Sequence, residues 1–200
     1  MLTVNIKSYP PPPFDKKEIL RYMGVRGEDS ELEKIVCECI ADAERLLTYK
    51  LCYAQMPIRI SGETIDFGFA SVRSVGLSKQ LLGCHSAIIF AATVGIGIDR
   101  LIAKSAITSQ VRELAASAIG AERIEALCEM FCTEKKAELA TLGLGMKSRF
   151  SPGYSDLPLA FQKDIFAALS CSKNIGLSLN ESLLMTPSKS VTAIIGVYNL

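Results

Sequence analysis

The longest helical pattern in the chain constrains its fold more than any other feature. No proline occurs between Ser109 and Leu142, where Ala, Glu, Leu, Lys and Arg dominate. These residues have high helix propensities, so the pattern predicts one long helix, about 50 Å in length at about 1.5 Å per residue. Gly120 in its middle indicates a kink or a close packing point, and Gly143 with Gly145 predicts the end of the helix.

Strand signals on both sides of this helix predict the fold class. Residues 57–67 read as a hairpin that turns at Gly62, and the apolar run Ala87–Val94 is typical of a fully buried strand. After the helix, Glu181–Met185 and Ser190–Tyr198 are strand-like. Strands in both halves, mostly linked as hairpins, predict an α+β fold with a twisted antiparallel or mixed sheet flanked by helices.

The proline run near the start of the chain and the turn residues between predicted helices indicate the domain organisation. Four consecutive prolines, Pro10–Pro13, predict an extended leader over residues 1–14 and a single domain over residues 15–200. Asp15 followed by Glu18 predicts the start of a short helix that ends at Gly24. Further helices are predicted by apolar spacing and turn residues over residues 30–49, 78–82, 98–107 and 159–169.

Composition excludes several classes of protein. Lys and Arg number 22 against 21 Asp and Glu, so a formal charge of +1 predicts neither a nucleic-acid nor a membrane partner. No apolar stretch approaches the roughly 20 residues that span a bilayer. Seven cysteines without regular spacing do not predict a disulfide framework. These features predict a soluble, reduced, cytoplasmic protein.

Metal and catalytic patterns are weak. Cys128 and Cys132 share a helix face, but a zinc site needs two more ligands, and the single histidine, His85, lies beside Cys84 ahead of a buried strand. Core packing is the favoured interpretation of the cysteines. No nucleophilic triad can be assembled, so we expect neither catalytic residues nor a metal site.

Two glycines, Gly95 and Gly97, lie between the buried strand and the next helix. Such a loop can bind phosphate through backbone N–H groups. The third glycine of the dinucleotide pattern is replaced by Arg100, and no Gly-Lys-Ser/Thr follows. A tight strand-to-helix turn is therefore the favoured interpretation.

The segment from Arg149 to Pro158 is the most informative for function. It combines an arginine fork, which can bind a carboxylate, with a Pro152-Gly153 corner and Tyr154. Taken alone, these residues leave two interpretations open, a ligand loop and a structural loop between two helices.

Arg149-Phe-Ser-Pro-Gly-Tyr154 resembles the R-x-x-P-G-Y motif of the activation domain of cobalamin-dependent methionine synthase. Downstream, residues 174–182, then Met185-Thr-Pro187 and Ser190-Val191, resemble the closing segment of the same domain in order and spacing. The earlier residues resemble stand-alone bacterial relatives more weakly, through residues 15–24 and 93–100.

This resemblance implies a protein that binds S-adenosylmethionine in a shallow groove on a twisted antiparallel sheet. It implies an activation component for reductive remethylation of cobalamin, rather than a self-sufficient catalyst, served by a flavodoxin- or ferredoxin-type electron donor. The chain lacks the Asp-x-His-x-x-Gly that ligates cobalt in the family, because His85 lies between Cys84 and Ser86. Cobalamin is therefore expected only on a partner methyltransferase module.

The resemblance also implies the site residues. Arg149 would hold the methionine carboxylate and Tyr154 would pack on the ligand. Ile195 and Gly196 fall where the last strand of the family contacts the ligand, although the family has aromatic residues there. The full set implied for S-adenosylmethionine is Arg149, Ser151, Pro152, Gly153, Tyr154, Ile195, Gly196, Glu125 and Glu181.

Two other functions remain open. The missing aromatic residues at Ile195 and Gly196 favour a protein-interaction module that docks on a corrinoid protein without binding S-adenosylmethionine. A free-standing methyltransferase is disfavoured, because its usual glycine-rich loop after a first strand cannot be located.

Overall fold

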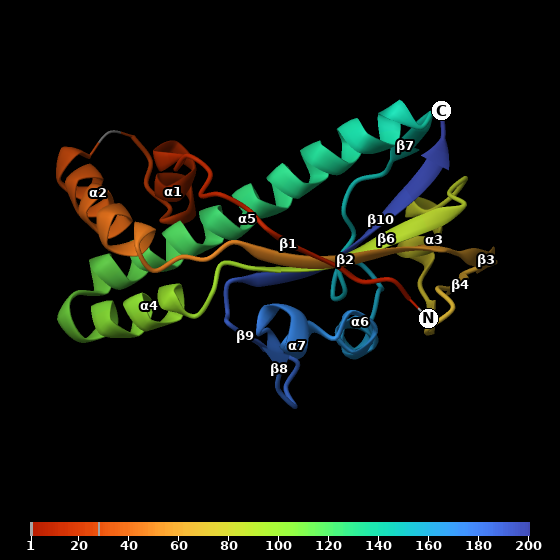
Figure 1. Cartoon of the computed structure of the whole chain (residues 1–200). Helices are drawn as coiled ribbons and strands as arrows, with labels where there is room; N and C mark the ends of the chain where they lie inside the picture. Colours follow the sequence, from red (N-terminus) through yellow and green to blue (C-terminus); the bar gives the residue numbers. More distant parts are fainter. Residues whose placement is uncertain (1, 28) are drawn as a thin grey trace.

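The computed structural model describes residues 2–27 and 29–200. As predicted, it is an α+β fold with an antiparallel sheet flanked by helices (Figure 1). The main sheet has five strands in the order β1–β2–β6–β10–β7. The strands of this sheet are β1 (Asn5–Ser8), β2 (Lys50–Pro57), β6 (Ser86–Thr93), β7 (Leu144–Met146) and β10 (Ser190–Asn199). Two small sheets flank it, one of β3 (Arg59–Ser61), β4 (Thr64–Asp66) and β5 (Ser71–Arg73), the other of β8 (Ser178–Leu179) and β9 (Met185–Thr186).

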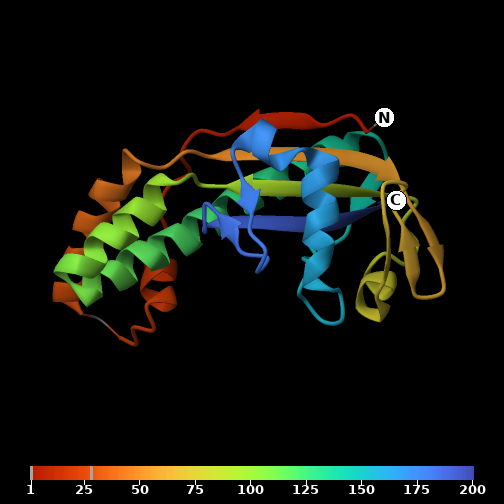
Figure 2. The same ribbon diagram turned by 90° about the horizontal axis from the view of Figure 1, so that it is seen from below.

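Helices cover both faces of the main sheet (Figures 1 and 2). The predicted long helix is α5, which runs from Gln110 to Thr141 across one face. The smaller helices α6 and α7 cover the opposite face. The remaining helices are α1 (Lys16–Tyr22), α2 (Ser30–Glu44), α3 (Val75–Gln80), α4 (Gly97–Thr108), the short 3₁₀ helix η1 (Leu159–Phe161), α6 (Gln162–Leu169) and α7 (Cys171–Ile175).

The central strand β6 explains why the sheet has a core on each side. All eight of its residues are buried, and its side chains alternate between the two faces. Ile88 and Phe90 pack with Phe131 and the rest of the core under α5. Ile89 points the other way and joins the core under α6 and α7. A strand buried on both faces is mostly apolar, and the continuous apolar run Ala87–Ala92 within β6 made this strand recognisable.

One predicted strand is wrong over most of its length, one observed strand was not predicted, and part of the predicted leader lies in the sheet. Of the predicted strand Glu181–Met185, only Met185 lies in a strand, β9, because residues 180–184 form a turn in which Leu184 N–H donates to the Asn180 side chain at 2.9 Å. The strand β2 was not predicted, although it pairs with β6 along its whole length. Part of the expected proline-rich leader, Asn5–Ser8, forms β1 at the edge of the sheet.

Gly95 and Gly97 form the tight turn that the sequence favoured over a phosphate loop. Gly95 has φ +84° and lies against Thr48, and Gly97 lies against the backbone carbonyl of Leu46. A side chain on Gly97 would clash with that carbonyl, so the glycine permits α4 to pack against the end of α2. Gly120 is likewise a close packing point, against Lys189 and Ile98.

Candidate functional site

A cavity of about 340 Å³ lies between α5 and the segment that follows β7. Glu125 of α5 lines one side. The other side consists of Ser148, Arg149, Ser151 and Tyr154. Four of these five residues were predicted from the sequence, and Ser148 was not.

The segment carrying Arg149 is fixed to the central part of the sheet. Phe150 and Ile194 of β10 exchange two backbone hydrogen bonds of 2.9 Å. The loop then turns at Gly153, which has φ +87° and whose N–H donates to Leu157 O at 2.9 Å. Tyr154 packs edge-on against Phe150 with ring centroids 5.3 Å apart. The turn therefore presents Tyr154, which is 66% exposed, at the mouth of the cavity.

Arg149 is paired with Glu125 across the cavity. The distance from Nη2 of Arg149 to Oε2 of Glu125 is 2.9 Å, and the side chains are 27% and 46% exposed. Burial disfavours the arginine charge, but the hydrogen bond to Glu125 and the neighbouring Cys128 outweigh it and raise the pKa of Arg149. The guanidinium is thus a permanent cation in a half-buried position.

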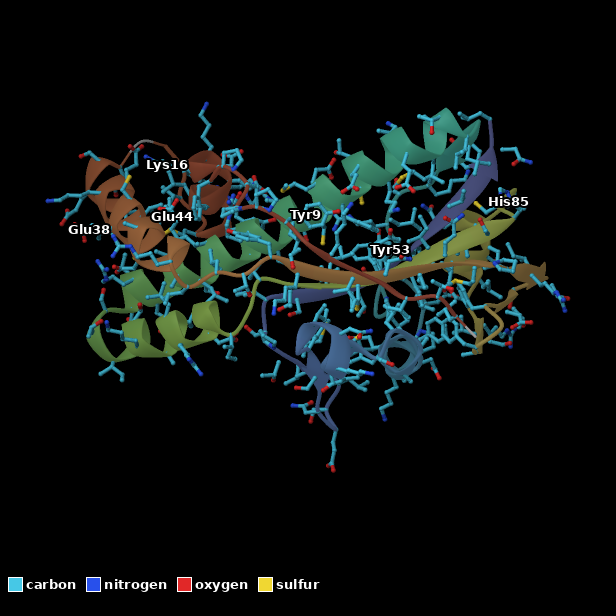
Figure 3. The ribbon with its side chains drawn as sticks, viewed as in Figure 1. Tyr9, Lys16, Glu38, Glu44, Tyr53 and His85 are labelled. Carbon is cyan, nitrogen blue, oxygen red and sulfur yellow. The ribbon has the colours of Figure 1, made fainter. Side chains whose placement is uncertain are left out.

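A larger groove of about 1110 Å³ shares Glu125 and Arg149 with this cavity. It runs between α5 and the segment that joins β1 to α1. Acidic side chains dominate its lining: Asp15, Glu18, Glu122, Glu125, Glu129 and Glu134, against Lys16, Lys17 and Arg149. Figure 3 shows Tyr9 and Lys16 on the side of this groove, whereas His85 lies at the opposite end of the molecule.

The buried residue Arg123 holds one wall of the groove in place, because it contacts the lining residues Pro12, Pro13 and Phe14. Its guanidinium donates to the carbonyl oxygens of Pro12 at 2.5 Å and Pro13 at 2.8 Å. It also pairs with Glu122 and lies over the ring of Phe14, 4.0 Å from its centroid. Proline cannot donate a backbone hydrogen bond, so its carbonyl is the group that α5 can hold. The proline run was recognised in the sequence, but its docking on α5 was not.

The remaining predicted site residues lie elsewhere. Pro152 is buried and does not line the cavity, nor does Gly153. The side chain of Ile195 is fully buried in the core under α5, and Gly196 lies against Leu81 and Cys84. Glu181 lines a separate cavity of about 660 Å³ beside α6 and α7. The structure therefore brings together Arg149, Ser151, Tyr154 and Glu125. It leaves five predicted residues outside the lining of this cavity: Pro152, Gly153, Glu181, Ile195 and Gly196.

The cysteines near the cavity are packed side chains. Burial raises the pKa of the Cys128 thiol to about 12 and that of Cys132 to about 11. Such thiols are protonated and weakly nucleophilic at neutral pH. Within residues 2–27 and 29–200, no group of three or more His, Cys, Asp or Glu side chains is placed to hold a metal ion. None of the described helices is both long and apolar enough to cross a membrane.

Comparison with known proteins supports the fold. No protein-family model matches the sequence, and no curated protein matches it. Among solved structures, the chain is similar to the MetH reactivation domain bound to AdoHcy, with a TM-score of 0.71 and 16% sequence identity. The match covers 98% of this chain and 78% of that one. The two proteins share a fold, as the sequence resemblance implied.

Proposed function

We propose that the protein binds S-adenosylmethionine and supports reductive remethylation of cobalamin on a partner methyltransferase such as methionine synthase. One observation carries this proposal: Arg149, Ser151, Tyr154 and Glu125 line one cavity on a fold shared with a reactivation domain that binds AdoHcy. AdoHcy is the demethylated product of S-adenosylmethionine, so a site for one is chemically close to a site for the other.

The cavity suits the amino-acid end of such a ligand. An arginine fork binds a carboxylate through two parallel N–H···O bonds. In the free protein one Arg149 nitrogen donates to Glu125. A ligand carboxylate would displace Glu125, and the released carboxylate of Glu125 would then face the ligand's sulfonium group. The exchange conserves the number of ion pairs, which keeps the cost of opening the existing pair small.

The adjoining groove suits the rest of the ligand. The cavity of about 340 Å³ is at the lower end of the range of roughly 300 to 1000 Å³ for small-molecule sites, and the groove extends it. Glu125 and Glu129 lie one turn apart on α5 and both line the groove. Their negative charge favours a cationic sulfonium over a neutral thioether.

In this proposal the chain binds and orients the methyl donor. Cobalamin on the partner module supplies the cobalt that accepts the methyl group, and an external donor of the flavodoxin or ferredoxin type supplies the electron. Arg149 and Tyr154 hold the ligand, and Glu125 orients its cationic end. Positioning of this kind accounts for a large part of catalysis when the chemistry belongs to a cofactor.

A second function is favoured by the last strand. Ile195 is fully buried and Gly196 has no side chain, so neither position offers an aromatic surface on which adenine could stack. A module of this fold that docks on a corrinoid protein without S-adenosylmethionine would have the same β10. The two functions make different predictions for Arg149. The first requires S-adenosylmethionine binding that depends on Arg149, whereas the second requires docking on the partner that depends on neither S-adenosylmethionine nor Arg149.

A remethylation assay tests the proposal. Cobalamin-loaded methionine synthase that lacks its own activation domain is mixed with a reduced flavodoxin, S-adenosylmethionine and this protein, and methylcobalamin is followed by its visible absorbance. We expect methylcobalamin to form with the wild-type chain and much more slowly with Arg149→Ala. Formation no faster than without the chain would contradict the proposal, and co-elution of the two proteins unaffected by ligand or by Arg149→Ala would favour the docking module.

A further inference from the structure

The short helix α3 holds both ends of the segment that carries the candidate site. We call residues 148–156 the site segment. At its C-terminal end, the carboxylate of Asp156 accepts hydrogen bonds from Ser74 Oγ at 2.7 Å, Val75 N–H at 2.6 Å and Gly76 N–H at 2.9 Å. These are the first residues of α3 and its N-cap. Asp156 therefore caps a helix that precedes it by about eighty residues in the chain.

The other end of α3 holds the start of the site segment. Gln80, the last residue of α3, donates from Nε2 to the backbone carbonyl of Ser148 at 3.1 Å. Ser148 directly precedes Arg149 and itself lines the cavity. The two anchors therefore lie just before Arg149 and two residues after Tyr154, so they bracket both ligand-binding side chains.

Glycines allow α3 to approach this closely. A Cβ atom on Gly76 would lie 2.8 Å from Ser155 Oγ and 3.2 Å from Phe150 Cζ. Beyond the helix, a Cβ atom on Gly196 of β10 would lie 2.7 Å from Leu81 Cδ2. Gly76 and Gly196 thus seat α3 between the site segment and the sheet, and this gives Gly196 a structural reason to be glycine.

We infer that α3 is a brace that positions the site segment, and that Asp156 and Gln80 are positioning residues of the ligand site. The inference rests on the proposed function for its ligand. The segment contains two positive-φ residues, Gly153 and Ser155, and most of it is exposed. Such a loop samples other conformations when it is not anchored, and a ligand must then order it at a cost in affinity.

The test compares two aspartate caps in the full-length protein. Asp156→Ala removes the three hydrogen bonds that Asp156 accepts from the start of α3, while the Ser74 N-cap remains. The control Asp29→Ala removes the N-cap side chain of α2, where Asp29 accepts from Glu31 and Leu32 N–H. Amide hydrogen exchange is measured without ligand at Gly153, Tyr154 and Leu157, whose N–H groups bond within the loop. The affinity for S-adenosylmethionine is measured separately by calorimetry. Gln80→Ala, which removes only one hydrogen bond, provides a second variant that should fold.

If α3 positions the site segment, Asp156→Ala should accelerate hydrogen exchange at these amides by about tenfold or more. The same variant should weaken the binding of S-adenosylmethionine by about tenfold. Gln80→Ala should have smaller effects in the same direction, and Asp29→Ala should change neither quantity. If the exchange rates at Gly153, Tyr154 and Leu157 are unchanged in both Asp156→Ala and Gln80→Ala, the inference is overturned, even if the affinity for S-adenosylmethionine changes. A wild-type protein that binds no S-adenosylmethionine would contradict the proposed function, and the exchange data would still decide whether α3 holds the segment.

Discussion

The ion pair between Arg149 and Glu125 lies where the cavity of the candidate site meets the acidic groove. Its atoms are 2.9 Å apart, and both residues line the cavity and the acidic groove. One partner comes from the site segment and the other from the middle of α5. A ligand that occupies both the cavity and the groove must therefore contact or open this pair, so substitutions at its two ends give separable predictions.

Replacing Arg149 tests its role as the carboxylate ligand. A charge-assisted pair contributes about 2 to 3 kcal/mol, so Arg149→Ala should weaken the binding of S-adenosylmethionine by about 30- to 150-fold. Arg149→Lys should restore only part of this, because an ammonium lacks the fork. Calorimetric titration measures the affinity and thermal unfolding measures the stability. A lowered melting temperature with unchanged affinity would instead assign Arg149 a structural role.

Replacing Glu125 tests the exchange of ion pairs. In Glu125→Gln, Arg149 loses its competitor, so a neutral thioether such as AdoHcy should bind as well as before or better. S-adenosylmethionine should lose the attraction between its cation and Glu125, which is worth about 1 kcal/mol at a half-exposed site. The affinity for S-adenosylmethionine relative to that for AdoHcy should therefore fall by about 3- to 10-fold. Equal losses for both ligands would argue against a charge-specific role.

Asp156 predicts a pH dependence of stability. Hydrogen bonds from Ser74 and from the Gly76 and Val75 amides lower the pKa of Asp156 from 3.8 to about 2 in the folded protein. A depressed carboxyl pKa stabilises the fold above the unfolded pKa, and this contribution is lost as pH falls from about 4 to about 2. The difference in unfolding free energy between wild type and Asp156→Asn should therefore shrink over that interval. Denaturant unfolding at several pH values measures it, and a difference that stays constant would contradict the assignment.

The buried pair of Glu122 and Arg123 predicts a large stability effect. Arg123→Met leaves the Glu122 carboxylate buried without its ion-pair partner. It also removes the hydrogen-bond donor to the carbonyl oxygens of Pro12 and Pro13. We expect a loss of about 3 to 5 kcal/mol in unfolding free energy. Glu122→Gln combined with Arg123→Met should lose less than Arg123→Met alone, because no uncompensated charge remains. Urea unfolding of the three proteins tests this order, and a double variant less stable than Arg123→Met would refute it.

Some elements were predictable because one local signal decides them. The long helix α5 contains no proline over 32 residues, and β6 is an apolar run because both of its faces are buried. Asp15 caps α1 as predicted, accepting from Lys17 and Glu18 N–H. Glu18 itself pairs with Arg21.

Other elements depend on contacts that are distant in sequence. The strand β2 contains Lys50, Gln55 and Pro57, so its own residues give a weak strand signal, and pairing with β1 and β6 decides its conformation. The predicted strand at Glu181–Met185 failed because the Asn180 side chain bonds the backbone of the next turn instead. The hydrogen bonds of Asp156 to α3 span about eighty residues, and no local pattern reports them.

Binding of S-adenosylmethionine to the isolated wild-type protein tests the account most directly. Titration calorimetry with ligand up to about millimolar concentration should show saturable binding, and thermal unfolding should shift upward as RT ln(1 + [L]/Kd) requires. The same titration with Arg149→Ala should show binding weakened by about 30-fold or more. The absence of both heat and thermal shift with the wild-type protein would contradict the proposal that this fold, in this chain, holds S-adenosylmethionine.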